Sequence, residues 1–66
     1  MEVLINGEPR EIPDETSLQA LLRLLDLQED RVAVELNRSI IKRNLWPATQ
    51  LHDRDRLEIV QFVGGG

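Results

Sequence analysis

The sequence predicts an α+β domain in which one amphipathic helix covers one face of a mixed β-sheet. Three observations support this: a tight-turn dipeptide between two extended segments, a leucine stripe with helical spacing, and strand-like segments after it. A chain of 66 residues has room for one domain, and with 3% aromatic residues its core must be mainly aliphatic.

The first twelve residues predict a β-hairpin. Met1 to Ile5 is apolar and contains Val and Ile, which favour strands. Asn6-Gly7 follows and tolerates the positive φ angles of a tight hairpin turn. The return segment, Glu8 to Ile12, contains Pro9, which cannot donate a ladder hydrogen bond, so we expect this strand at a sheet edge.

A helix of about three turns is predicted next. Thr16 and Gln19 have the spacing of a capping box, with Thr16 as the N-cap. Leu24 flanks the apolar stripe, and we expect it to be partly exposed. The stripe itself faces the sheet and consists of leucines at i, i+3, i+4 and i+7, namely Leu18, Leu21, Leu22 and Leu25.

Two further strands follow the helix. Arg31 to Asn37 alternates between apolar and other residues, as a half-buried strand does. Asn37-Arg38 is then a turn, and Ser39 to Lys42 is predicted to be a short strand. The helix therefore lies between a first hairpin and a second group of strands.

The last third of the chain predicts an irregular segment and a central strand. Arg43 to Gln50 is irregular, and we expect Trp46 to fill a gap in the core. Asp53-Arg54-Asp55 is a turn. Leu57 to Phe62 has a mixed pattern, which predicts a strand at the centre of the sheet that is buried on both faces.

Composition and charge argue against several classes of function. The absence of cysteine excludes disulfides, thiolate metal sites and a catalytic thiol. A net charge of −4 disfavours nucleic-acid binding, and no apolar run approaches the roughly 20 residues that span a bilayer. We therefore expect a cytoplasmic protein with no nucleic-acid or membrane partner. A carrier or binding module is favoured over an independent enzyme, since there is little room for a substrate pocket.

Other candidate sites have simpler explanations. His52 to Asp55 offers three metal ligands, but a calcium loop starting there would need glycine at 58 and glutamate at 64, so we expect a turn and no metal. Thr16-Ser17 resembles the phosphopantetheine site of acyl carriers, but those are all-helical, and helix capping explains both residues. The one cationic cluster is either solvated surface or a contact for an acidic partner; it consists of Arg38, Lys42 and Arg43.

The C-terminal glycines are the strongest functional signal. We predict a domain over residues 1–62 and a flexible tail over 63–66, Val-Gly-Gly-Gly. Glycine has no Cβ, so such a tail can enter a narrow channel, and its terminal carboxylate is open to attack. The alternative is a frayed end or a linker remnant. A phosphate-binding glycine loop is excluded because no helix follows.

These segments together resemble the ubiquitin-like β-grasp family, and within it the ThiS family of sulfur carriers in thiamin biosynthesis. The resemblance runs from Met1 to Gly66. Arg54 departs from it, because such proteins often have glycine there. The implied fold is a mixed sheet of four to five strands, one helix packed across it, and a flexible C-terminal glycine tail. The matching segments are Ile5-Asn6-Gly7, Thr16 to Leu25, Val34 to Asn37, Arg43 with Trp46, and Glu58 to Gly66.

The resemblance implies a carrier that is not itself an enzyme. An E1-like adenylyltransferase, ThiF, would use ATP and magnesium to adenylate the Gly66 carboxylate. A persulfide donor would convert it to a thiocarboxylate, which passes sulfur to thiazole synthase, ThiG. The carrier would bind no cofactor or metal and would be monomeric when free. Partner contacts are expected from Phe62, Val63, Gly64 and Gly65; for Phe62, a place in the core is the alternative.

Three other functions remain open at this level. The small subunit of molybdopterin synthase shares the fold, tail and thiocarboxylate chemistry, although such chains tend to be longer. A ubiquitin-like modifier would join its tail to target lysines. A non-covalent interaction domain would make no use of the glycines. Co-purifying partners, isopeptide-linked ladders and tail truncation, respectively, distinguish these functions.

Overall fold

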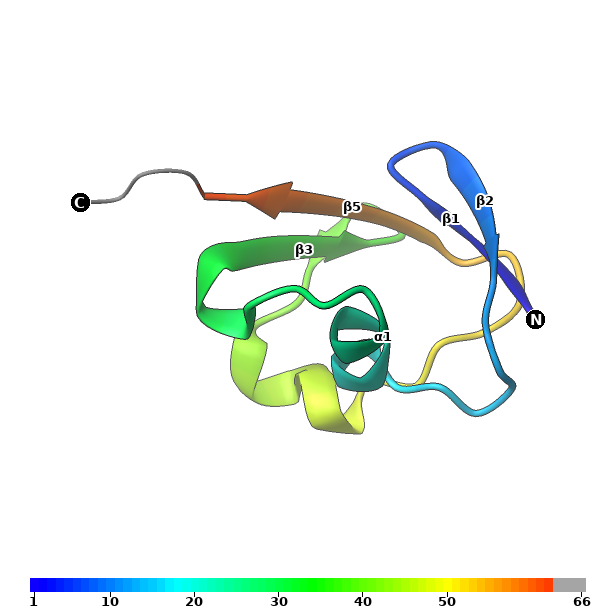
Figure 1. Cartoon of the computed structure of the whole chain (residues 1–66), viewed down its shortest axis with the longest axis horizontal. Coiled ribbons are helices and arrows are strands. Elements are labelled where there is room, and N and C mark those ends of the chain that lie inside the picture. The colour runs from blue at the N-terminus through cyan, green and yellow to red at the C-terminus, as the bar shows by residue number, and fades with distance from the viewer. Residues whose placement is uncertain (63–66) are drawn as a thin grey trace.

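A computed structural model describes residues 1–62 as a five-stranded mixed sheet with one helix across it (Figure 1). The strand order is β2-β1-β5-β3-β4; β1 and β5 are parallel, and the other neighbours are antiparallel. This confirms the α+β prediction. The elements are β1 (Glu2–Ile5), β2 (Glu8–Glu11), α1 (Leu18–Leu24), the 3₁₀ turn η1 (Glu29–Arg31), β3 (Val32–Leu36), β4 (Ser39–Ile40), the 3₁₀ helix η2 (Arg43–Ala48) and β5 (Arg56–Gln61).

The N-terminal hairpin has the predicted turn and position. Ile5 pairs with Glu8, which leaves a two-residue loop. Both loop residues have positive φ, 50° at Asn6 and 84° at Gly7, as a tight hairpin turn requires. Strand β2 lies at the sheet edge, as expected from Pro9.

The chain start is fixed beside the hairpin. The Met1 ammonium donates hydrogen bonds to the Ile12 carbonyl at 2.9 Å and to Asp14 Oδ1 at 3.2 Å. The hydrogen bond to Asp14 raises the pKa of this ammonium group above its usual value. The first strand is therefore tied to the segment that leads into the helix.

Helix α1 begins one residue later than predicted, and the capping box at Thr16 is wrong. Ser17 is the N-cap, and its Oγ accepts a hydrogen bond from the Ala20 N–H at 3.1 Å. The Thr16 hydroxyl instead donates to the Pro13 carbonyl at 2.6 Å. The cause is a distant contact, because a β-bridge between Ser17 and Gln50 keeps this segment extended up to the helix start.

Helix α1 also has seven residues, about two turns instead of three. It ends in a Schellman motif: Asp26 has φ 58°, its N–H donates to the Arg23 carbonyl, and the Leu27 N–H donates to Leu22, both at 3.0 Å. This motif usually uses glycine, which explains why the sequence pattern did not reveal the end. Leu24 is 60% exposed, which confirms its flanking position.

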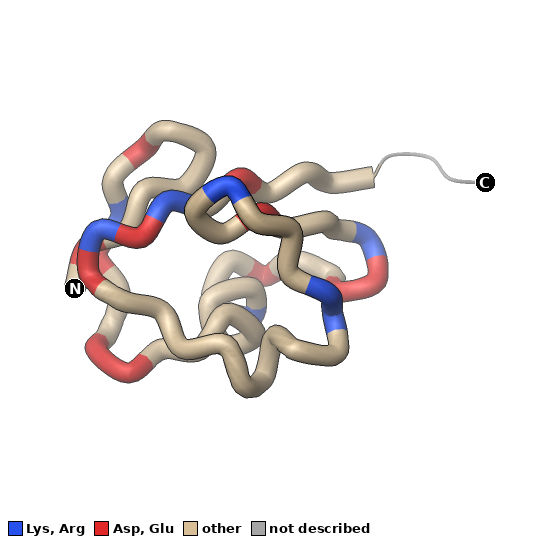
Figure 2. Tube along the Cα trace, turned by 180° about the vertical axis from the view of Figure 1, so that it is seen from behind, with Lys and Arg blue, Asp and Glu red and all other residues tan. Residues whose placement is uncertain are grey.

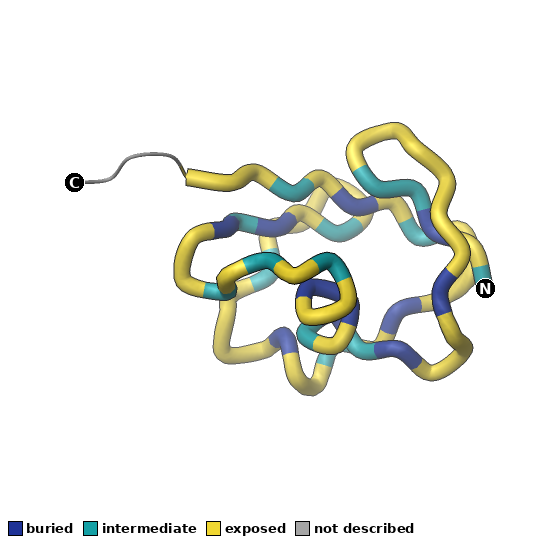
Figure 3. The backbone as a smooth tube through the Cα atoms, in the orientation of Figure 1, coloured by how far each residue is buried: buried dark blue, intermediate teal, exposed yellow. Residues whose placement is uncertain are grey.

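Trp46 fills the core as predicted. Its side chain is 2% exposed, and its Nε1–H donates to the Ile41 carbonyl at 2.9 Å. The segment that carries it, predicted to be irregular, forms the 3₁₀ helix η2. The core lies between α1, η2 and the sheet (Figure 3), and its buried apolar residues are Val3, Ile12, Leu18, Leu21, Leu22, Val32, Val34, Trp46, Leu51 and Leu57.

Strand β5 is central, as predicted, but the prediction that both of its faces are buried is wrong. Leu57 is 1% exposed and Ile59 is half-buried, whereas Arg56, Glu58 and Val60 are exposed. The helix covers only one face of the sheet (Figure 1), so alternate side chains of β5 face solvent. We call the uncovered side the outer face. No helix among residues 1–62 is long and apolar enough to cross a membrane.

Arg54 occupies a backbone conformation that suits glycine, and Arg54→Gly should stabilise the domain. The predicted turn at 53–55 is present, and Arg54 has φ 71°. Its exposed ion pair with Asp53, at 3.8 Å, contributes little. We expect the free energy of unfolding to rise by about 0.5–1 kcal/mol, measured by urea denaturation. The matched control is Arg10→Gly in β2: Arg10 does not have a positive φ, so glycine there should lower the free energy of unfolding. A lower free energy of unfolding in both variants would contradict the strain at Arg54.

Candidate functional site

The end of β5 is the point from which the glycine segment continues. β5 lies between β1 and β3 and ends on the side of the molecule opposite the N-terminus (Figure 1). The Phe62 N–H donates to the Arg31 carbonyl at 2.7 Å, which extends the pairing with β3 by one residue. Of the predicted tail and contact residues, Val63, Gly64, Gly65 and Gly66 lie outside the described residues.

Phe62 is 54% exposed, which excludes the core alternative for this residue. Val60, two residues earlier on the same extended backbone, is 57% exposed on the outer face. Ile40 of β4, which is separated from β5 by β3, is 78% exposed. We call Ile40, Val60 and Phe62 the outer-face patch; exposed apolar residues grouped in this way are typical of contact surfaces. Partner contact through Phe62 stays a prediction.

A shallow hollow on the outer face lies beside this patch. Its apolar lining comes from Ala33, Val34, Ile40 and Val60. Two carboxylates, Glu35 and Glu58, also line it and lie directly opposite each other across β3 and β5. Like charges at such a cross-strand pair are unfavourable, so this face suits a partner that brings a basic group. Neither Val60 nor Ile40 was predicted by name as a contact residue; the adjacent β-branched pair Ile59-Val60 was the available signal, because one of the two must face outward.

Two asparagine side chains hold β5 in place. Asn6 Oδ1 accepts a hydrogen bond from the Ile59 N–H at 2.8 Å, and its Nδ2 donates to the Ile59 carbonyl at 3.1 Å. Asn37 Oδ1 accepts from the Arg56 N–H at 2.9 Å, and its Nδ2 donates to Asp55 Oδ1 at 3.0 Å. Both asparagines were predicted only as turn residues. They connect two separate turns to the strand that leads to the glycines.

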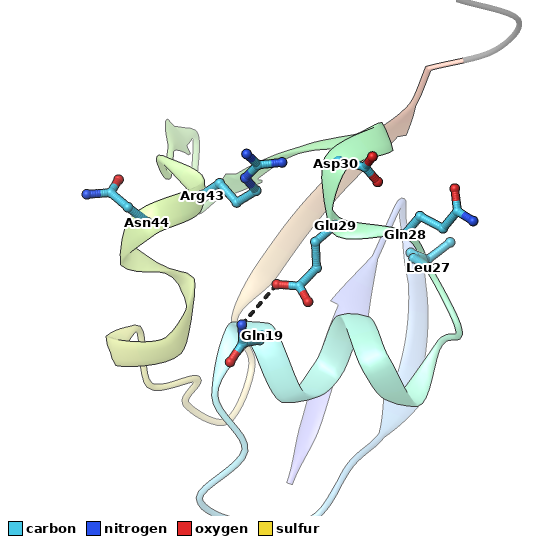
Figure 4. A pocket seen from close by; sticks show the side chains of 7 residues that line it. All are labelled: Gln19, Leu27, Gln28, Glu29, Asp30, Arg43 and Asn44. Atoms are coloured by element: carbon cyan, nitrogen blue, oxygen red, sulfur yellow. Dashed lines mark hydrogen bonds between the residues drawn. The ribbon is translucent and has the colours of Figure 1, made fainter.

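A polar groove on the helix side of the molecule has a different character (Figure 4). Gln19 Nε2 donates to Glu29 Oε1 at 2.9 Å, and Arg23 Nε lies 3.5 Å from Glu29 Oε2. Arg43 and Asp30 lie at its rim. The groove contains none of the residues predicted to contact a partner, so we do not include it in the candidate site.

The remaining charged candidates are surface positions. Arg38, Lys42 and Arg43 are all exposed, and basic and acidic positions are interspersed over the molecule (Figure 2). The His52 N–H donates to Asp55 Oδ2 at 2.7 Å, which confirms the predicted turn. Within residues 1–62, no group of three or more His, Cys, Asp or Glu side chains is placed to hold a metal ion.

One helix on a five-stranded mixed sheet, with a central last strand leading to C-terminal glycines, defines a ubiquitin-like β-grasp protein. The model of the ThiS family matches residues 3–66. The chain belongs to the ThiS family.

Individual relatives agree with this assignment. The sulfur carrier protein ThiS of Bacillus subtilis is 43% identical over 53 residues, which cover 80% of each chain. The crystal structure of a thiamine biosynthesis protein (ThiS) from Geobacter metallireducens superimposes with a TM-score of 0.86 at 33% identity and covers both chains fully. A thiazole synthase of Magnetococcus marinus is 38% identical over the whole of this chain, which corresponds to 20% of that protein.

Proposed function

We propose that this chain carries sulfur as a thiocarboxylate on Gly66 for the thiazole ring of thiamin. The observation that carries the proposal is that a tail ending in three glycines, residues 63–66, follows directly after the exposed Phe62 at the end of β5, in a chain of the ThiS family. The chain has no cysteine and one histidine, so the activating groups belong to partners. We propose residues 1–62 as the docking domain and residues 63–66 as the reactive tail.

The proposed reaction has three steps at the Gly66 carboxyl group. A carboxylate oxygen attacks the α-phosphorus of ATP, magnesium pyrophosphate leaves, and an acyl-adenylate forms. The terminal sulfur of a persulfide then attacks the acyl carbon and AMP leaves. A thiol from a partner then attacks the donor's sulfur in the resulting acyl disulfide, which forms a disulfide between the thiol and the donor and releases the thiocarboxylate as the leaving group. Activation of the carboxylate as a mixed anhydride turns a poor leaving group into a good one, and the ATP and magnesium are bound by the partner.

We propose three partners for these steps in the cytoplasm. An E1-like adenylyltransferase of the ThiF type activates the tail, and a persulfide protein supplies the sulfur. Thiazole synthase, ThiG, accepts it; the similarity to the Magnetococcus marinus thiazole synthase supports this acceptor over the large subunit of molybdopterin synthase. The carrier acts as a monomer that offers its outer-face patch and tail to each partner.

The mass of the C-terminal peptide tests the proposal. Trypsin cleavage after Arg56 gives the peptide Leu57 to Gly66, which contains no methionine. After incubation with ATP, magnesium, ThiF and a persulfide donor, we expect this peptide to gain about 16 Da, the difference between sulfur and oxygen. Oxidation of Met1 adds the same nominal mass but falls in another peptide.

Reactions without ATP or without the persulfide donor are the controls, and in each the peptide mass should stay unchanged. An unchanged peptide in the complete reaction, with a ThiF that modifies Bacillus subtilis ThiS in parallel, would contradict the sulfur-carrier function. The protein would then be a modifier or a plain binding domain.

A further inference from the structure

We propose that Asn6 is a positioning residue for the reactive tail, because its side chain fixes the end of β5 from which the tail continues. This inference rests on the proposed function and deepens it. The turn role of Asn6 accounts for its backbone conformation but not for its two side-chain hydrogen bonds to Ile59.

The Asn6 side chain continues the sheet where strand β1 stops. Main-chain pairing between β1 and β5 ends when the Asn6 N–H donates to the Leu57 carbonyl at 2.9 Å. In a continued parallel ladder, the Ile59 N–H would donate to the main-chain carbonyl of residue 6. The Asn6 side-chain carbonyl takes that place, while its NH₂ group binds the Ile59 carbonyl. One amide side chain therefore imitates a peptide unit of the missing strand.

Beyond Ile59, the described part of β5 is held from the β3 side. The Phe62 N–H donates to the Arg31 carbonyl, so the main-chain groups of Phe62 point toward β3. The N–H and C=O of Gln61 therefore point to the opposite edge of β5, beyond the end of β1. Hydrogen bonds from the β1 side end at Ile59. Ile59 is thus the last described residue where β5 is held from both sides, seven positions before the Gly66 carboxylate.

Loss of this contact should loosen the strand end without altering the chemistry. A strand end that is hydrogen-bonded to a neighbour on one side only, and is exposed to solvent, opens more readily than a strand paired on both sides. A partner that binds the tail would then have to order the end of β5 as well, and this ordering opposes binding. The reacting groups are the Gly66 carboxylate and groups of the partner, so the rate at saturation should not change. The expected signature is a raised KM with an unchanged kcat.

The chain offers a matched pair of variants. Asn6 has φ 50° and Asn37 has φ 51°, so glycine fits both turns without strain. Each side chain makes two hydrogen bonds, so Asn6→Gly and Asn37→Gly each remove two. The bonds of Asn37 lie at Asp55 and Arg56, at the start of β5, far along the strand from the tail. We expect both variants to lower Tm to a similar extent.

Only Asn6→Gly should affect the tail. In ATP-dependent adenylation by ThiF, we expect the KM of Asn6→Gly to rise about fivefold to tenfold, because the partner must order about one more residue of the strand. Its kcat should stay within twofold of the wild-type value. For Asn37→Gly, both KM and kcat should stay within twofold. Hydrogen exchange of the free protein gives a readout independent of function, because the Phe62 amide should exchange at least several-fold faster in Asn6→Gly and not in Asn37→Gly. Asn6→Asp keeps the acceptor for the Ile59 N–H and should recover part of both effects.

Each outcome decides the proposal. Equal KM values for the two glycine variants, or unchanged exchange at Phe62, would show that Asn6 stabilises the fold and does not position the tail. If Asn6→Gly fails to fold, Asn6→Asp carries the same comparison below its Tm. Failure of the wild-type chain to be adenylated would overturn the proposed function instead, and the exchange experiment would still test Asn6.

Discussion

Deletion of Gly65 and Gly66 should abolish adenylation and leave the fold intact. The deletion keeps every buried apolar residue of the described core, the last of which is Leu57, so Tm should change by no more than about 1–2 °C. The new terminal carboxylate, on Gly64, would be about 7 Å short of its position in the full chain, at roughly 3.3–3.6 Å per residue. Misplacement of a reacting group by about 1 Å can cost on the order of 100-fold in rate. ATP–pyrophosphate exchange with ThiF measures the adenylation step directly.

Two companion variants separate the length of the tail from its chemistry. An alanine added after Gly66 keeps every native residue but moves the carboxylate one residue outward, and we expect exchange to fall at least 100-fold. Gln61→Ala, at an exposed position outside the tail and the expected partner contacts, keeps the length and the terminal glycines, and should retain most of the activity. Loss of folded structure on truncation, or full exchange activity of the shortened chain, would contradict the tail assignment.

Local signals predicted the parts of the fold that depend on neighbouring residues. The Asn6-Gly7 turn, the leucine stripe and the buried Trp46 all follow from short-range patterns, and the structure confirms each. The helix start did not follow, because the bridge between Ser17 and Gln50 joins segments that are distant in sequence. The apolar content of β5 predicted a central strand, but it does not tell how many layers cover the sheet.

The candidate site was predictable to the same limited extent. The glycines stand out by composition, and the position of Phe62 directly before the tail at 63–66 marks it as a contact candidate. The second role of Asn6 was not predictable, since its partner Ile59 lies 53 residues away. The contribution of Ile40 to the outer-face patch depends on which strand lies beside β3, and strand order is a property of the folded sheet.

Replacement of Phe62 by Asp should weaken docking without unfolding the domain. The side chain is 54% exposed, so Tm should fall only slightly. Full burial of a phenylalanine side chain contributes about 1.5–3 kcal/mol, and covering the exposed half contributes roughly half of that. Burial of a carboxylate near an apolar partner surface adds a further cost. Together these effects predict a rise of about 10-fold to 100-fold in the KM for adenylation, measured by steady-state kinetics with ThiF.

Leu24→Asp is the matched control, because Leu24 is also a large apolar residue, is 60% exposed, and lies on helix α1, which covers the opposite face of the sheet. It makes the same change in charge, so a general effect of added acidity would raise the KM of both variants. We expect only Phe62→Asp to do so, and Val60→Asp to act in the same direction, since Val60 shares the outer face. Equal KM values for Phe62→Asp and Leu24→Asp would show that docking uses the tail alone. The exposure of the outer-face patch would then have no part in partner recognition.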